Sequence, residues 1–316
     1  MGTSTRNTPA VRIDAAAIGF RSFQPQCPGR VGGLALKQPK QPQPHPRSAV
    51  AAQQPYRRRC GPVRLAAPVR PGGHAGTWIT LGAHVIVHGR SRERATAPAA
   101  RVGGGEVAVA DLASFAQVRA LIEDVARRSG ELHGLVNNAG IGFRTAPPRG
   151  ARTEDGHEPT WQVNFLSAVL LTLGLQDALA AGRGRVVHMS SGVHASGSVD
   201  LEQPDGPRYA SPYAQSKIAL VMLAREQGER WRDLGLDVNA CSPGWIATKM
   251  GGPGGDSLAE GVDTPLWLLT APELAGTTGR YFWRRHEEEP NPQVEDADAR
   301  IRLWDLAERS VSGPDG

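Results

Sequence analysis

The feature that most constrains the fold of this chain is an alternation that begins near Gly76 and continues toward the C-terminus. Short apolar runs of strand length are separated by longer amphipathic stretches, a pattern typical of a parallel β-sheet covered by helices. The sequence therefore predicts an α/β fold. The apolar runs predict strands at residues 84–88, 107–110, 134–137, 185–189, 237–241 and 280–283.

Three amphipathic stretches are long enough to form helices. They cover residues 115–128, 161–179 and 212–234. In the first of them, apolar residues such as Phe115 and Val118 recur at spacings of three and four, which places them on one helix face. The predicted strands and helices alternate along the chain.

Residues 1–76 differ in composition from the rest of the chain. They carry 12 Lys and Arg against one acid, Asp14, a net charge of +11, which leaves 24 bases and 30 acids, or −6, for the remaining residues. Eleven of the 25 prolines also lie before residue 77. Such a segment cannot bury enough apolar surface to fold. We therefore expect a basic Pro/Arg-rich segment at 1–76 and one domain at 77–316.

Three explanations of residues 1–76 stay open: a disordered basic tail, an organellar transit peptide, and a sequence translated out of frame or wrongly joined. The proline-rich repeats argue against the amphipathic helix of a transit peptide. The basic run Arg57-Arg58-Arg59 is isolated and lacks interleaved aromatic residues, so we expect no nucleic-acid partner.

The cysteines and the apolar runs exclude several other classes of protein. Cys27, Cys60 and Cys241 show no paired spacing, so neither a disulfide framework nor a cysteine metal site is indicated. The longest apolar runs fall far short of the roughly 20 residues that span a bilayer, and no signal-peptide pattern opens the chain. We expect a cytoplasmic protein with no metal and no membrane span.

Tyr213 and Lys217 form the most informative polar pair. They stand four residues apart directly after Pro212, so they share one face of a helix that begins at this proline. An ammonium beside a phenol favours the phenolate and moves the tyrosine pKa from about 10 toward neutral pH. The pair is therefore a candidate for proton transfer, and an ordinary surface pair is the alternative.

Four sequence motifs follow one another in the order found in a known family. They are Asn137-Asn-Ala-Gly140, the strand that ends in Ser190-Ser191, the pair Tyr213 and Lys217, and Ser242-Pro-Gly-Trp-Ile-Ala-Thr248. In these motifs the chain from Leu81 to Gly313 resembles the short-chain dehydrogenases/reductases. Asp155-Gly-His-Glu158 with Trp161-Gln-Val-Asn164, and the run from Asn239 to Met250, resemble the retinol-dehydrogenase-like branch. The resemblance implies a Rossmann-like, doubly wound parallel sheet and hydride transfer between a nicotinamide cofactor and an alcohol or carbonyl compound.

The resemblance also implies a catalytic set of Asn164, Ser191, Tyr213 and Lys217. Tyr213 would exchange the proton of the substrate oxygen, and Lys217 would lower its pKa and hold the nicotinamide ribose. Ser191 would bind the substrate oxygen, and Asn164 would hold a water that links Lys217 to solvent. Ser190 is the alternative serine, because side chains alternate along a strand and only one of the two can point into the site.

The cofactor set that the resemblance implies follows the ends of the predicted strands. It comprises Arg90, Asp111, Leu112, Asn137, Ala139, Gly140, Tyr213, Lys217, Pro243, Gly244, Ile246 and Thr248. Small residues let the backbone pass close to a nucleotide, and Asp111 would meet the adenine ring. The segment His88-Gly-Arg-Ser-Arg92 offers guanidinium groups for a 2′-phosphate and no acid for a 2′-hydroxyl. NADP(H) is therefore favoured over NAD(H).

One part of the family pattern is missing. The family has a TGxxxGxG turn after its first strand, where the pyrophosphate rests on backbone N–H groups. The nearest glycines, Gly72, Gly73 and Gly76, follow no apolar strand, and Trp78 interrupts them. The first strand and the glycine-rich turn are therefore predicted to be absent or replaced in about residues 50–81.

Two functions remain open on these residues. One is an NADP-dependent oxidoreductase of small hydrophobic alcohols, aldehydes or ketones, and the other is a catalytically inactive relative that cannot bind nucleotide. The resemblance implies a homodimer or homotetramer. Trp245, Trp267 and Trp283 are read as core residues rather than as the wall of a substrate pocket.

Overall fold

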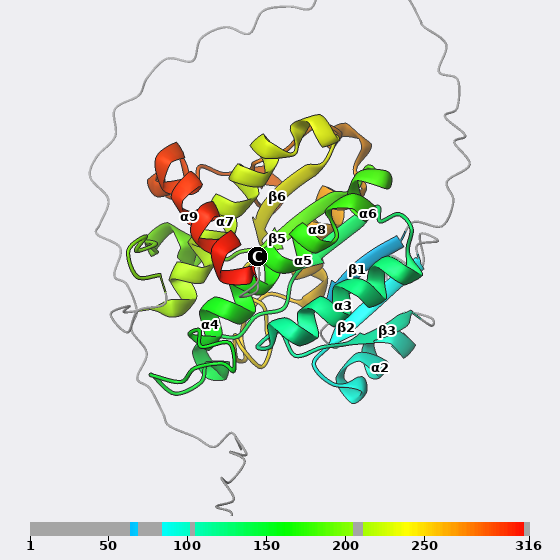
Figure 1. Cartoon of the computed structure of the whole chain (residues 1–316), viewed down its shortest axis with the longest axis horizontal. Coiled ribbons are helices and arrows are strands. Elements are labelled where there is room, and N and C mark those ends of the chain that lie inside the picture. The colour runs from blue at the N-terminus through cyan, green and yellow to red at the C-terminus, as the bar shows by residue number, and fades with distance from the viewer. Residues whose placement is uncertain (1–63, 69–83, 102–104, 205–210, 313–316) are drawn as a thin grey trace, which may run out of the picture. The chain divides into compact units, whose positions relative to one another are not determined.

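A central β-sheet organises the part of the chain that the computed structural model describes, namely residues 64–68, 84–101, 105–204 and 211–312 (Figure 1). The eight strands of this part lie in the order β3-β2-β1-β4-β5-β6-β7-β8. All neighbouring strands are parallel except β8, which runs antiparallel to β7. The strands are β1 (Arg64–Pro68), β2 (His84–Gly89), β3 (Glu106–Val109), β4 (Gly134–Asn137), β5 (Arg185–Met189), β6 (Asp237–Ser242), β7 (Tyr281–Trp283) and β8 (His286–Glu287).

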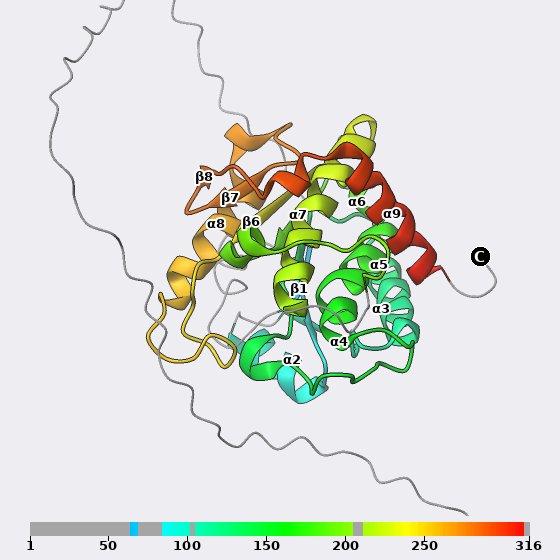
Figure 2. The ribbon, with the colours of Figure 1, turned by 90° about the vertical axis from the view of Figure 1, so that its left-hand side faces the viewer.

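Helices cover both faces of this sheet. They are α2 (Arg92–Arg101), α3 (Phe115–Arg128), α4 (Pro159–Trp161), α5 (Ser167–Gly174), α6 (Gln176–Ala181), α7 (Pro212–Arg230), α8 (Leu258–Thr270) and α9 (Ala297–Val311). Figure 2 shows α3, α5 and α9 together on one side of the sheet and α8 on the other. The doubly wound, Rossmann-like fold that the sequence predicts is therefore confirmed.

Alternate residues of the strands build two separate cores. On β2, Ile86 belongs to the core under α3, α5, α7 and α9, whereas Val85 and Val87 belong to the core under α2 and α8. Successive side chains of a strand point to opposite faces, so a continuous apolar run buries both of them. Among the described residues, no helix is long and apolar enough to cross a membrane, and no group of three or more potential metal ligands occurs.

The position of the first strand is filled by β1, which pairs with β2 on one side and with β4 on the other. The described part of the chain thus has a strand between β2 and β4. This strand lies upstream of the boundary predicted between residues 76 and 77, so the sheet begins within the segment that the sequence assigned to 1–76. Gly72, Gly73 and Gly76 lie outside the described residues. The prediction that the glycine-rich turn is absent or replaced concerns this segment and therefore also lies outside them.

The helix predicted at 161–179 is wrong as a single element. The structure divides it into the end of α4, a π-helical turn at Gln162–Leu166, α5 and α6. By contrast, the predicted helix at 115–128 and the predicted strands at 134–137 and 185–189 have the observed bounds. The π-helical turn holds one of the predicted catalytic residues, Asn164.

Candidate active site

The start of α7 fixes the position of Tyr213 and Lys217. The hydroxyl of Ser211 accepts a hydrogen bond from Ala214 N, and Pro212 occupies the first turn, where it lacks the N–H that the helix could not use. The helix therefore starts immediately before Tyr213. Lys217 lies one turn later with its Nζ 5.3 Å from the centre of the Tyr213 ring. The structure confirms that the two side chains are neighbours.

Lys217 is a buried cation held by a backbone carbonyl. Only 4% of its surface is exposed, and its Nζ donates a hydrogen bond of 2.7 Å to the carbonyl of Met189 at the end of β5. A charge-assisted hydrogen bond of this kind offsets part of the cost of removing an ammonium from water. It also ties α7 to the strand that precedes the two serines.

The two serines after β5 have different surroundings. The hydroxyl of Ser190 is buried and donates a hydrogen bond of 2.7 Å to the carbonyl of Lys217. Ser191 is half-buried, and its Oγ accepts a long hydrogen bond of 3.4 Å from Val193 N as the cap of a 3₁₀ helix at Gly192–Ser196. The Ser190 hydroxyl thus donates its hydrogen to the backbone. The Ser191 hydroxyl only accepts in the bond to Val193, so that bond does not use its hydrogen.

Asn164 fastens the loop after β4 to the helices. Its Oδ1 accepts from Ile141 N at 2.8 Å, and its Nδ2 donates to the carbonyl of Ile141 and to the Oγ of Ser216, both at 2.9 Å. The π-helical turn places this amide toward the loop, in keeping with the frequent occurrence of such turns at functional sites. A Cβ added to Gly140 would lie 3.1 Å from Asn164 Oδ1 and 3.8 Å from Lys217 Nζ. The three residues are therefore close together.

The next turn of the same loop packs on Tyr213. A Cβ at Gly142 would come within 2.1 Å of Tyr213 Cδ2, so only glycine fits against this ring. The ring of Phe143 lies 4.5 Å from the Tyr213 ring, centre to centre, and Phe143 adopts a positive φ of 43°. A non-glycine residue in this region is uncommon and costs backbone strain. This backbone conformation places an aromatic ring beside the candidate proton donor.

A large cavity opens at the carboxyl ends of β4, β5 and β6. Its volume is about 910 Å³, and ligands of open α/β sheets bind at this edge. Eight residues of the predicted site line it, namely Gly140, Ser191, Tyr213, Lys217, Pro243, Gly244, Ile246 and Thr248, and so does the alternative serine, Ser190. The structure thus brings most of the predicted site together. Asn164 is not among the residues that line this cavity.

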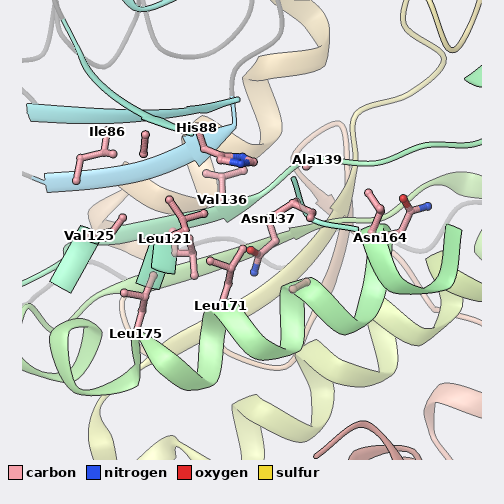
Figure 3. A pocket seen from close by; sticks show the side chains of 15 residues that line it. Ile86, His88, Leu121, Val125, Val136, Asn137, Ala139, Asn164, Leu171 and Leu175 are labelled. Carbon is pink, nitrogen blue, oxygen red and sulfur yellow. The ribbon is translucent and has the colours of Figure 1, made fainter. Parts of the chain in front are cut away.

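Three other predicted cofactor residues border a smaller cavity of about 30 Å³ between the sheet and the helices α3 and α5. They are Leu112, Asn137 and Ala139. Figure 3 shows Asn137 and Ala139 along the sheet side of this cavity, with Leu171 of α5 and Leu175, which follows α5, on the helix side. The residues after β4 therefore border both cavities.

Asn137 belongs to a buried polar network. Its Nδ2 donates to Thr172 Oγ1 at 3.1 Å and to His188 Nδ1 at 3.2 Å, and His188 Nε2 lies 2.8 Å from Gln227 Oε1. Because Nδ1 accepts from the amide, Nε2 carries the hydrogen in the neutral ring. Burial lowers the pKa of His188 to about 4, which keeps the ring neutral. The network ties β4 and β5 to α5 and α7. The Asn137 Nδ2 is used by these buried hydrogen bonds.

Arg90 and Asp111 lie at the ends of β2 and β3. Arg90 is exposed directly after β2, while Asp111 caps the following turn, with its Oδ1 accepting from Ala113 N at 3.0 Å. Asp111 Oδ1 is thus partly used by the backbone, which is the alternative role of an aspartate after a strand.

Comparisons with known proteins agree with the sequence motifs and with this geometry. A sequence model described as "short chain dehydrogenase" matches residues 74–257. Retinol dehydrogenase 14 of Homo sapiens is 31% identical over 279 residues, which cover 75% of this chain and 81% of that protein. The chain belongs to the short-chain dehydrogenase family. Polyprenol dehydrogenase of Mus musculus is 39% identical over 220 residues, with 61% of this chain and 64% of the relative covered.

Solved structures of other proteins share the fold of this short-chain dehydrogenase. A Mycobacterium Paratuberculosis protein superposes with a TM-score of 0.66 at 25% identity and covers 79% of this chain and 93% of its own. An NADPH-bound carbonyl reductase from chicken fatty liver has a TM-score of 0.55 at 21% identity, with 72% and 98% covered. The second likeness concerns the fold alone.

Sequence reasoning missed several groups of this short-chain dehydrogenase site. The carbonyl of Met189 could not be read from the sequence, because any residue supplies one. Trp245 and Trp283, read as core residues, line the cavity and are 61% and 40% exposed, so that prediction is wrong for both. Trp267 instead packs against the second core. His194 also lines the cavity, and no motif marked it.

Proposed function

We propose that this protein is an NADP-dependent oxidoreductase that transfers hydride between a nicotinamide cofactor and an alcohol or carbonyl compound, with Tyr213 as the general acid and base. The observation that carries the proposal is the cavity at the carboxyl ends of β4, β5 and β6, which Tyr213, Lys217 and Ser191 line together. A nicotinamide nucleotide, when bound, supplies or accepts the hydride.

The residues of the chain fit such a cofactor. A Cβ added to Gly140 would lie 3.8 Å from Lys217 Nζ, so a side chain there would fill the space beside the lysine. Gly244 has a φ of +88°, which favours glycine and turns the loop after β6 across the cavity. Lys217 would hold the nicotinamide ribose, and Pro243, Gly244, Ile246 and Thr248 would border the nicotinamide.

In the direction of carbonyl reduction, the hydroxyl of Tyr213 donates its proton to the substrate oxygen. The ammonium of Lys217 stabilises the negative charge that remains on the tyrosine, and the hydroxyl of Ser191 donates a hydrogen bond to the oxygen as charge develops on it. Asn164 keeps the loop from Gly140 to Gly142 against Tyr213. In the oxidative direction the same groups act in reverse.

Arg90 supports NADP(H) over NAD(H). It is exposed at the end of β2, the strand end that meets the adenosine ribose in dinucleotide-binding folds. No carboxylate occurs from His88 to Arg92, so a ribose 2′-hydroxyl would lack its usual acceptor, whereas a 2′-phosphate would meet a guanidinium.

The substrate is a hydrophobic alcohol, aldehyde or ketone. Apolar side chains dominate the cavity wall, including Met189, Met250, Leu258 and Val262, and such walls bind apolar ligands with a few polar groups for orientation. The names of two relatives, retinol dehydrogenase and polyprenol dehydrogenase, support the same substrate class. A cytoplasmic location, and a homodimer or homotetramer, stay predictions.

The second candidate function is an inactive relative that cannot hold nucleotide. The sequence Arg64 to Pro68 and the residues that follow contain no TGxxxGxG turn, and this observation favours it. Equilibrium binding of NADPH to the purified full chain, followed by NADPH fluorescence, separates the two. Saturable binding supports the oxidoreductase, whereas a folded chain without binding supports the inactive relative.

A further inference from the structure

The backbone of Ser191, the candidate catalytic serine, is held through its carbonyl. Ser191 caps the 3₁₀ helix at Gly192–Ser196, and its carbonyl meets two nitrogens of one residue, His194. The backbone N–H of His194 donates to this carbonyl at 3.0 Å, and the ring Nδ1 lies 2.8 Å from it. A carbonyl only accepts, so Nδ1 carries a hydrogen. His194 therefore occupies both lone pairs of the Ser191 carbonyl.

The hydroxyl of Ser191 is held less firmly than its backbone. Its Oγ accepts the 3.4 Å bond from Val193 N, which is long for a hydrogen bond between an N–H and an oxygen. The position of the hydroxyl therefore follows the position of the backbone that carries it. Ser191 lines the large cavity together with Tyr213, so a shift of this backbone would move the two hydroxyls relative to each other.

His194 is itself fixed by residues from the C-terminal part of the chain. Its ring lies 4.3 Å from the ring of Tyr281 in β7, centre to centre, and the residue is 4% exposed. The Nδ2 of Asn291 donates to the carbonyls of Ala195 and Gly197, both at 3.0 Å, at the end of the same 3₁₀ helix. His194 thus links Ser191 to β7.

Ring packing alone does not account for a histidine at this position. The Nε2 of His194 is buried and has no hydrogen-bond partner among the described residues, and a buried polar atom without a partner costs free energy. A phenylalanine would pack on Tyr281 without that cost, but it could not donate to Ser191. The hydrogen bond from Nδ1 is therefore what the imidazole provides.

We propose that His194 is a positioning residue for Ser191, and that its Nδ1–H holds the Ser191 backbone where the serine hydroxyl can donate to the substrate oxygen beside Tyr213. In this role His194 acts through Ser191. The inference rests on the proposed function, in which Ser191 binds the substrate oxygen, and it adds to that function a residue that no sequence motif marked.

A double-mutant cycle separates positioning from folding. His194→Phe keeps a ring on Tyr281 and loses the donor, whereas His194→Asn puts an amide N–H near the place of Nδ1. With NADPH and an apolar ketone, we expect His194→Phe to lower kcat/KM by about 10–100-fold and His194→Asn by less than about threefold. In a Ser191→Ala chain, His194→Phe should change kcat/KM by less than about twofold, because the group that it positions is gone.

Gln293→Ala is the matched control. The side chain of Gln293 accepts from Val199 N at 2.8 Å and donates to the Val199 carbonyl at 2.9 Å, so this variant loses two hydrogen bonds of a neighbouring turn and none to Ser191. It should lower the urea midpoint and keep kcat/KM within about twofold. A loss of kcat/KM in the control as large as that in His194→Phe, or an equal effect of His194→Phe with and without Ser191, overturns the inference.

Ligand binding gives a readout that needs no turnover. The probes are an aryl methyl ketone and the alkene in which a CH₂ group replaces the carbonyl oxygen, bound to the full chain in the presence of NADP⁺. Ser191→Ala and His194→Phe should each lower the preference for the ketone by a similar factor, about fivefold.

An equal lowering by the two variants supports the inference even if no ketone is reduced, in which case the proposed function fails alone. Equal binding of the ketone and the alkene by the wild-type chain, or a full ketone preference in His194→Phe, overturns the inference.

Discussion

The amide of Asn164 and the backbone of Ile141 form a reciprocal pair of hydrogen bonds, in which Oδ1 accepts from Ile141 N and Nδ2 donates to the Ile141 carbonyl. Asn164 is 2% exposed. This pair fixes the loop after β4 to the π-helical turn, and the same loop carries Gly140 and Gly142 against Lys217 and Tyr213. The position of the candidate proton donor therefore depends on an amide that does not line the large cavity.

Replacement of Asn164 tests this dependence. Asn164→Ala leaves the N–H and carbonyl of Ile141 without their partner, so the free energy of unfolding should fall by about 1–3 kcal/mol. Urea denaturation measures the change. Asn164→Asp keeps the acceptor for Ile141 N but sets a second oxygen against the Ile141 carbonyl in a buried place, so it should be at least as destabilising as Asn164→Ala. Equal stability of all three proteins would show that the loop is held by other contacts.

Gly142→Ala should impair turnover more than it impairs folding. The added Cβ would stand 2.1 Å from Tyr213 Cδ2, so the Tyr213 ring must move, and a displacement of about 1 Å in a reacting group can cost about 100-fold in rate. Steady-state kinetics with NADPH and an apolar ketone measures the loss. The control is Gly130→Ala, whose Cβ would meet nothing within 4 Å. Full activity of Gly142→Ala would refute the packing of Gly142 on Tyr213.

The buried ring of His188 makes stability depend on pH. Its pKa is lowered from 6.5 to about 4 in the folded chain, so below pH 6.5 the unfolded state binds a proton that the folded state resists. The free energy of unfolding is therefore highest above pH 6.5 and falls by about 3 kcal/mol in total as the pH drops from 6.5 to about 4. We expect wild-type unfolding to depend more steeply on pH over this range than that of His188→Gln. Parallel curves for the two proteins would contradict the assignment.

Arg90 should select between the two nicotinamide cofactors. Arg90→Ala removes the guanidinium that would meet a 2′-phosphate, so the Kd for NADPH should rise about tenfold or more while the Kd for NADH stays within about twofold. Fluorescence titration of both cofactors checks this, with Arg127→Ala of α3, which lies in another part of the fold, as the control. A similar loss for both cofactors would count against a phosphate contact.

Much of the fold could be predicted because the strand signals are strong. The runs at β4 and β5 are bounded by glycine, arginine and polar residues and are buried on both faces, so their ends are visible in the sequence. The strand β1 could not be predicted, because Arg-Leu-Ala-Ala-Pro has no β-branched or aromatic residue. Helices α2 and α8 each contain a proline, which argues against a helix interior, and neither was predicted.

The site could be predicted in part, for a similar reason. Tyr213 and Lys217 meet because helical periodicity alone brings residues four apart onto one face. The π-helical turn at Asn164 depends on tertiary contacts with Ile141 and Ser216, which leave no periodic signal. The exposure of Trp245 and Trp283 likewise depends on where the loop after β6 and the β7–β8 hairpin lie, and their residue types favour burial.

The most direct test of the account is NADPH oxidation in the presence of apolar ketones, measured for the wild-type full chain beside Tyr213→Phe. We predict ketone-dependent oxidation by the wild-type chain and a loss of about 10²–10⁴-fold in kcat for Tyr213→Phe, with NADPH still bound. A wild-type chain that binds NADPH and yet reduces no ketone, or a Tyr213→Phe variant with wild-type kcat, would contradict the assignment of Tyr213 as the proton donor.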